Sequence, residues 1–141
     1  MRILVVDDNE LAREAIREFL SASPEVHGLY IACDGRQAVE AVTAHRPDVM
    51  VIDIGLPEGG GLQVADRVRR LFPETGVVVL ADHDNAQYRR AAAECGASAF
   101  VAKQRMATQL MPAIVSVGSG SRELELEKVR KAVATPPRRG D

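Results

Sequence analysis

Short apolar segments recur along the chain, and each is followed by a segment in which apolar residues return every three or four positions. The short segments are typical of buried β-strands, and the longer ones are typical of amphipathic helices. The predicted strands cover residues 3–6, 26–32, 49–53, 77–81 and 99–102. Five strand-then-helix units in succession predict an α/β fold, in which one parallel sheet carries helices on both faces.

The predicted helices begin at polar or glycine-containing turns. Asn9 can cap the first helix, and Asp34 with Gly35 turns the chain into the second. Residues 86–95 form an alanine-rich helix that Gly96 ends, and Pro112 predicts a kink or a frayed turn in the helix that begins near residue 106. The buried face of the first helix should hold Leu11, Ala12, Ala15, Ile16, Phe19 and Leu20. That of the third should hold Leu62, Ala65, Val68, Leu71 and Phe72.

The strand units use residues 1–117, which we expect to form one domain. Residues 118–141 should form a linker, a short helix and a disordered tail, because a Gly-Ser-Gly-Ser joint begins at Gly118 and the chain ends in a polar, proline-containing stretch. A length of 141 residues and a content of 46% apolar and 27% charged residues are typical of one globular unit.

The charge balance excludes several classes of partner. Eighteen Lys and Arg residues against twenty Asp and Glu residues give a net charge of −2, so we expect no direct nucleic-acid or membrane binding by this chain. The sequence has neither a membrane-length apolar run nor a signal-peptide layout, which predicts a cytoplasmic protein. Its two cysteines lack CxxC spacing and its three histidines are scattered, so a zinc site or a histidine triad is not indicated.

Four ionic residues stand at the ends of predicted strands. Asp7 and Asp8 follow the first strand, Asp53 ends the third and Lys103 follows the fifth. In an open parallel sheet the carboxyl ends of the strands share one edge, where ligands bind, so we expect these side chains to converge. Three crowded carboxylates would raise one another's pKa, and a hard divalent cation with oxygen ligands relieves this repulsion. Mg²⁺ suits such a site because it keeps positions free for water and phosphate oxygens.

This set of side chains suits the transfer of a phosphoryl group onto a carboxylate. Asp53 would attack phosphorus, while the metal and the Lys103 ammonium neutralise the phosphoryl oxygens and an acyl phosphate forms. Taken alone, Asp7 and Asp8 fit a solvated pair at a helix start, and Lys103 fits a surface charge. Their occurrence together with Asp53 favours a functional site. Arg13, one turn into the first helix, should be solvated.

Three motifs together resemble the receiver domain of two-component response regulators. They are Asp7-Asp8 after an apolar strand, the segment Asp53-Ile54-Gly55-Leu56-Pro57, and the segment from Gly96 to Lys103. The resemblance spans residues 1 to about 117 and implies a flavodoxin-like, doubly wound sheet of (βα)5 type with strand order 2-1-3-4-5. The chain mildly resembles receivers of the LuxR/NarL type, which are attached to DNA-binding domains and regulate transcription.

The resemblance also implies a role for each site residue. Asp53 would accept the phosphoryl group from a sensor histidine kinase or a phosphotransfer protein. Asp8, Asp53 and the backbone carbonyl of Gly55 would hold Mg²⁺, Asp7 would act through metal-bound water, and Lys103 would bind the phosphate. Such a domain is a phospho-accepting switch rather than an enzyme, and it catalyses only its own phosphorylation and dephosphorylation. Members of the family also form homodimers.

The chain departs from the family at two positions. Ala81 stands where the family has a Thr or Ser hydroxyl at the end of the fourth strand, while Phe100 matches the aromatic residue that changes rotamer when the switch operates. Gln104 follows Lys103 in place of the common proline, so we expect a trans bond there. Without that hydroxyl the switch lacks one charge-assisted hydrogen bond, which contributes about 1.5–3 kcal/mol. We therefore predict a switch that is weakened or that is coupled through different contacts. The alternative is a phosphorylation-independent interaction module of receiver-like fold.

Two other functions share this fold class. A flavodoxin-like nucleotide binder should offer hydroxyls and amides in its first loop, whereas Asp7, Asp8 and Glu10 offer negative charge. A phosphatase with an aspartate nucleophile typically carries an Asp-x-Asp pair after the first strand, which this chain does not supply. The glycines at 59–61 lack the GxxxxGK[ST] pattern, so we interpret them as a flexible turn rather than a phosphate cradle.

Overall fold

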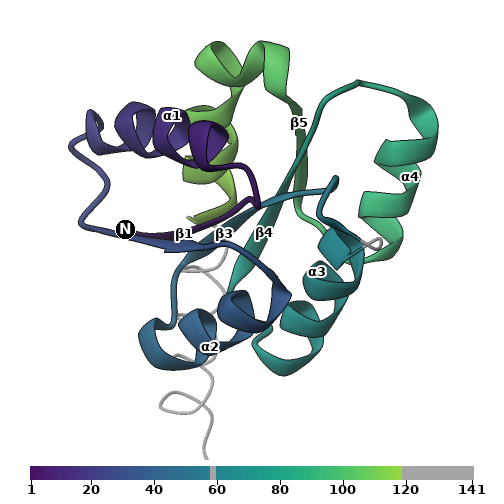
Figure 1. The fold of residues 1–141 in the computed structure, drawn as a ribbon, viewed down its shortest axis with the longest axis horizontal. Coiled ribbons are helices and arrows are strands. Elements are labelled where there is room, and N and C mark those ends of the chain that lie inside the picture. Colours follow the sequence, from purple (N-terminus) through teal and green to yellow (C-terminus); the bar gives the residue numbers. More distant parts are fainter. Residues whose placement is uncertain (58–59, 119–141) are drawn as a thin grey trace, which may run out of the picture.

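The computed structural model describes residues 1–57 and 60–118, and its centre is one parallel sheet (Figure 1). The strand order is β2-β1-β3-β4-β5, as the sequence predicts. The strands are β1 (Arg2–Val6), β2 (Gly28–Ala32), β3 (Val49–Asp53), β4 (Gly76–Ala81) and β5 (Ala99–Ala102). Only β2 differs from its prediction by as much as two residues, because it begins at Gly28.

Helices cover both faces of the sheet. They are α1 (Glu10–Ser21), α2 (Gly35–His45), α3 (Gly60–Leu71), α4 (Ala86–Glu94) and a helix over residues 106–118, which follows a 3₁₀ turn (Lys103–Arg105). The first helix and the helix over 106–118 pack on one face, and α2, α3 and α4 pack on the other (Figure 1). The predicted doubly wound α/β fold is therefore confirmed.

The side chains of β1 alternate between the two faces. Ile3 and Val5 join a core with Ile16 of α1 and the helix over 106–118, whereas Leu4 and Val6 join the core under α2 and α3. Every residue of β3 is buried, which explains its unbroken apolar run. Since β3 lies between β1 and β4, its last residue emerges in the middle of the sheet edge.

Local signals fix the helix ends. The side chain of Asn9 accepts a hydrogen bond from the Ala12 amide, and Asp34 caps α2 in the same way through Gln37. Before Pro47, Arg46 adopts a left-handed conformation with φ of 46° and ends α2. At the end of α4, Gly96 has φ of 84°, a conformation that glycine adopts without strain.

The prediction of a buried position is wrong for three residues. Leu11 is 82% exposed, Ala15 is exposed, and Leu71 is 54% exposed. Leu11 lies about 140° around the helix from Ile16, at 100° per residue, so it cannot share the face that Ile16 buries. In α3 the predicted Ala65 and Val68 are buried, and Gly61 and Val64 are buried with them.

The last helix is continuous from residue 106 through Pro112 to Gly118, so the predicted frayed turn at the proline is not found. The remainder of the predicted joint, the short helix and the tail, residues 119–141, lie outside the described residues. The domain boundary near 117 therefore stays a prediction. No peptide bond in 1–57 or 60–118 is cis, and the bond between Lys103 and Gln104 is trans as expected. Among the helices described here, none has the length and apolar content that spanning a membrane requires.

Candidate functional site

The carboxyl ends of three strands bring Asp7, Asp53 and Lys103 together. Strands β1 and β3 are paired with Val6 opposite Ile52, so the next residues, Asp7 and Asp53, are neighbours at the sheet edge. Lys103 follows β5 directly, and its Nζ lies 3.2 Å from Asp7 Oδ2 and 3.1 Å from Asp53 Oδ2. The predicted convergence of these three residues is confirmed.

The turn after β1 holds Asp7 in place. Its carboxylate is fully buried, and Oδ1 accepts a hydrogen bond of 2.9 Å from the Asn9 amide. The Arg13 guanidinium donates to the Asp7 carbonyl oxygen at 2.9 Å. The expectation that Arg13 is simply solvated is therefore wrong. The contact with Asp7 could not be predicted, because the charge pattern of a helix shows only which residues face outward.

Asp53 is held as firmly, and it is only 7% exposed. Its Oδ1 accepts from the Gly55 amide at 2.9 Å, while the Ile54 amide donates to the Leu80 carbonyl at 2.8 Å and extends the pairing of β3 with β4. The carboxylate that the sequence predicts at the tip of a buried strand is therefore at that tip, with one oxygen fixed by the backbone and the other by Lys103.

Gly61 lets α3 pack closely against the end of β3 that carries Asp53, a role that the sequence did not reveal. A Cβ at position 61 would lie 2.3 Å from the Asp53 carbonyl oxygen and 2.9 Å from the Ile54 Cα. Only glycine lets the first turn of α3 approach the end of β3 so closely. The run of glycines at 59–61 is visible in the sequence, but it was interpreted as a flexible turn rather than as a place of close packing.

Burial and neighbouring charges shift the pKa of two residues of the site, Asp7 and Lys103. Burial raises the pKa of Asp7, as does the nearby negative charge of Asp53, although the Asn9 amide and Lys103 oppose the shift. Burial alone would lower the pKa of Lys103, but its hydrogen bond to Asp53, the charge of Asp53 and then Asp7 outweigh burial and raise that pKa. One ammonium thus serves two buried carboxylates, which leaves the pocket short of positive charge.

Oxygen atoms of Asp7, Asp8 and Asp53 lie within 4.8 Å of one another, close enough to share a metal ion. Asp8 is exposed, so the group opens to solvent on its side. Carboxylate oxygens are hard ligands of the kind that Mg²⁺ prefers, and a pocket with excess negative charge favours a cation. The donor set therefore fits the predicted Mg²⁺.

A cavity of about 220 Å³ adjoins Asp53. It reaches the loop after β4, so this loop forms part of the approach to the carboxylate. Its lining residues are Asp53, Ile54, Gly55, Leu62, Asp82, His83 and Tyr88.

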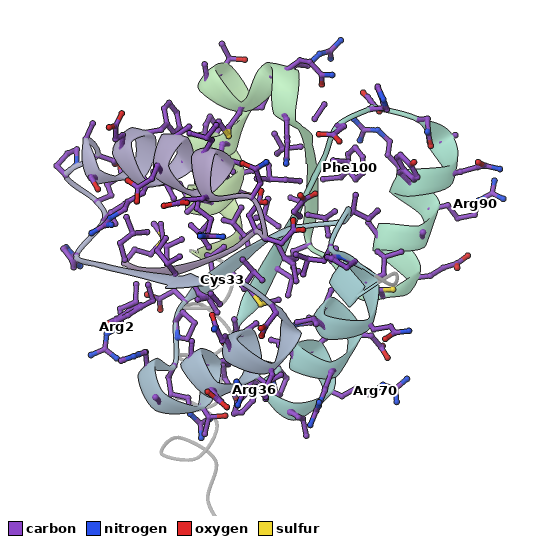
Figure 2. All side chains as sticks on the ribbon, viewed as in Figure 1. Arg2, Cys33, Arg36, Arg70, Arg90 and Phe100 are labelled. Atoms are coloured by element: carbon purple, nitrogen blue, oxygen red, sulfur yellow. The ribbon has the colours of Figure 1, made fainter. Side chains whose placement is uncertain are left out.

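The two predicted switch residues lie on neighbouring strands. Ala81 is the fully buried last residue of β4, paired with Ala102 of β5, and it has no hydroxyl to offer the pocket. Phe100 is half-buried on the side of β5 that faces α4 (Figure 2). The Arg89 guanidinium of α4 lies 4.8 Å from the centroid of its ring.

Comparison with known proteins identifies this arrangement. The family model described as the response regulator receiver domain matches residues 3–115. The chain belongs to this family. The receiver domain is 32% identical over 120 residues to the transcriptional regulatory protein DegU of Brevibacillus brevis, a match that covers 85% of this chain and 51% of DegU.

Solved receiver structures agree with the fold. The signal receiver domain of the putative response regulator NarL from Mycobacterium tuberculosis is 34% identical, with a TM-score of 0.78 over 84% of this chain and 96% of that one. A LuxR-family two-component response regulator from Aurantimonas sp. SI85-9A1 is 26% identical, with a TM-score of 0.79 over 91% and 97% of the two chains. The receiver domain spans about half the length of the curated relatives it matches.

Proposed function

We propose that this receiver domain accepts a phosphoryl group on Asp53 and uses it as a signal. The observation that supports this proposal best is the Lys103 ammonium, which contacts both Asp53 and the buried Asp7 beside a third carboxylate. A surface lysine would not need two buried anionic partners. A site for phosphoryl transfer needs such a cation, because the reaction concentrates negative charge on the phosphoryl oxygens.

The reaction would begin with attack by a carboxylate oxygen of Asp53 on phosphorus. The bond between phosphorus and the imidazole nitrogen of a donor phosphohistidine breaks, its electron pair stays on the imidazole, and an acyl phosphate remains on Asp53. Lys103 would then bind a phosphoryl oxygen in place of a carboxylate oxygen. The Gly55 amide would keep the other oxygen of Asp53 oriented, as it does in the free carboxylate.

We further propose that Mg²⁺ binds here, with Asp8, Asp53 and the Gly55 carbonyl as ligands and Asp7 acting through water. When bound, the ion supplies charge neutralisation for the phosphoryl oxygens. Asp7 is suited to an indirect role because it is fully buried, whereas Asp8 is exposed and accessible to an ion from solvent. Attack of water on the acyl phosphate at the same site would release inorganic phosphate, leave the free Asp53 carboxylate and so reset the domain.

A donor for Asp53 would be a sensor histidine kinase or a phosphotransfer protein, and the expected compartment is the cytoplasm. DegU is named a transcriptional regulatory protein, which makes control of transcription the favoured output of a longer protein that contains this domain. Homodimerisation remains a prediction from the family. In the described part of the chain no contact favours the phosphorylation-independent module, whose only support is Ala81.

A titration with beryllofluoride, a mimic of the phosphoryl group, tests the proposal. ¹⁹F NMR should show saturable binding to the wild type in the presence of Mg²⁺ and none without it. Asp53→Asn should abolish binding, because the amide cannot complete the acyl-phosphate-like adduct. Asp66→Asn is the matched control, since Asp66 pairs with Arg70 on the outer side of α3. Binding by Asp53→Asn, or no binding by the wild type, would contradict the proposal, and the second result would favour the interaction module.

A further inference from the structure

The loop between β4 and α4, residues 82–85, is held by side chains that reach it from other elements. The amide nitrogen of the Gln104 side chain donates to the Asp82 carbonyl oxygen. At the other end of the loop, Arg89 of α4 forms two contacts with the Asp84 carboxylate, of 2.5 Å and 3.0 Å. Ala81, the residue that precedes the loop, adds no hydrogen-bonding side chain. The hydrogen bonds that side chains of other elements donate to the described loop therefore come from Gln104 and Arg89.

Gln104 is bonded directly to the lysine of the functional site. Both residues belong to the 3₁₀ turn after β5. Lys103 Nζ lies 3.1 Å from Asp53 Oδ2 and 3.2 Å from Asp7 Oδ2, but 3.8 Å from Asp82 Oδ1. This single turn therefore contacts the acceptor carboxylate through one side chain and the loop through both.

A phosphoryl group on Asp53 would change the balance among the partners of Lys103. The added oxygens bring more negative charge to the pocket and compete for the ammonium. Asp82 is the weakest of the present partners, because its contact is the longest and its side chain is 75% exposed to screening solvent. A shift of the Lys103 backbone would move the turn to which Gln104 belongs, and the hydrogen bond from Gln104 to the Asp82 carbonyl would carry that shift to the backbone of the loop.

We propose that Gln104 is the positioning residue that couples the state of Asp53 to the β4–α4 loop in this chain. It fills a role that a hydroxyl at position 81 cannot fill here, and it acts through the Asp82 carbonyl rather than on the phosphoryl group itself. The inference rests on the proposed function, since it requires Asp53 to be phosphorylated. The change would continue through Asp84 and Arg89 to Phe100, because Arg89 contacts both.

Backbone amide NMR with saturating beryllofluoride and Mg²⁺ tests the coupling. In the wild type the amides of residues 82–88 and of Phe100 should shift on binding. Gln104→Ala and Gln104→Glu should each bind beryllofluoride within about twofold of the wild-type affinity, because the residue does not contact the ligand site. Both should lose most of the shift at 82–88, since alanine has no side-chain donor and glutamate offers only an acceptor.

The control is Gln87→Ala, which removes an exposed side-chain amide from α4 near the same loop and should leave the shifts unchanged. Amides of α1 and α2 report whether each variant is folded. Wild-type shifts at 82–88 in both Gln104 variants would overturn the proposal, as would loss of beryllofluoride binding in a folded Gln104→Glu protein, because Gln104 would then belong to the binding site. Failure of the wild type itself to bind would instead mark the failure of the proposed function.

Discussion

The acidic pocket and the β4–α4 loop lie side by side at one edge of the sheet, but they are built in different ways. Asp7 and Asp53 are buried, and each is fixed by strand pairing and by a backbone amide that donates to its carboxylate. The loop residues 82–85 are exposed, and contacts from Gln104 and Arg89 hold them. The pocket is therefore part of the framework of the fold, whereas the loop rests on contacts that single substitutions can change.

This difference explains how a receiver domain can keep its chemistry while its coupling changes. A substitution in the pocket alters buried charges and the strands that carry them, so it affects stability and reactivity together. The methyl group of Ala81 is fully buried at the end of β4 and has no polar atom that needs a partner there. The proposed coupling through Gln104 uses a side chain beside the loop instead of a hydroxyl at position 81.

The largest effect is expected where the backbone supports the pocket. Gly61→Ala should lower the free energy of unfolding by about 3 kcal/mol, because the new Cβ would meet the Asp53 carbonyl at 2.3 Å and backbone must move. The displaced Asp53 should also bind beryllofluoride more weakly. Urea denaturation, with the midpoint and the slope both measured, reports the first effect.

Gly60→Ala is the matched control in the same helical turn. A Cβ at position 60 would have its nearest contact at 3.8 Å, an ordinary van der Waals distance, so this variant should be at least as stable as the wild type. Equal stability of the two variants would show that the end of β3 yields easily, and the distinction between a rigid pocket and an adaptable loop would then fail.

The sequence predicted the elements and the pocket because both depend on local or alternating patterns. The unbroken apolar run of β3 placed Asp53 at a strand tip, and strand order alone then brought Asp7 and Lys103 beside it. Gly61 and Gln104 could not be predicted in this way, since their roles arise from contacts with residues distant along the chain. Leu11 was misplaced for a different reason: its hydrophobicity was taken as a sign of burial, although the spacing of five residues already rotates it about 140° away from Ile16.

A smaller effect, with the opposite sign, is expected from relieving the crowded charge. The pKa of Asp7 is raised by burial and by Asp53, so its favourable contribution to stability is complete below 3.8, the unfolded value, and is lost as the pH rises through the folded pKa. At neutral pH the ionised carboxylate therefore costs stability. Asp7→Asn should raise the free energy of unfolding by about 0.5–2 kcal/mol there, in the absence of Mg²⁺.

This gain should shrink as the pH falls toward 3.8, because the wild-type carboxyl is then protonated as well. It should also shrink in excess Mg²⁺, which compensates the charge that the variant removes. Urea denaturation at several pH values, with Asp66→Asn as a surface control, provides the measurement. If Asp7→Asn is less stable at neutral pH, the attraction of Lys103 exceeds the cost of burial, and the pocket is not under electrostatic stress.

The smallest change in stability is expected in the loop. The side chains of Arg89 and Asp84 are 51% and 33% exposed, so solvent screens their ion pair and Arg89→Ala should leave the thermal midpoint unchanged within error. The same substitution should change the ¹³C shifts of the Phe100 ring, because the guanidinium that lies over it is removed. The hydrogen bond from Arg89 also lowers the pKa of Asp84, which should return toward its ordinary value in the variant.

Arg90→Ala is the matched control, since Arg90 extends outward from α4 (Figure 2) and should affect neither observable. A clear fall in the midpoint for Arg89→Ala alone would mean that the loop contributes to the framework as the pocket does, and the contrast between the two regions would be lost.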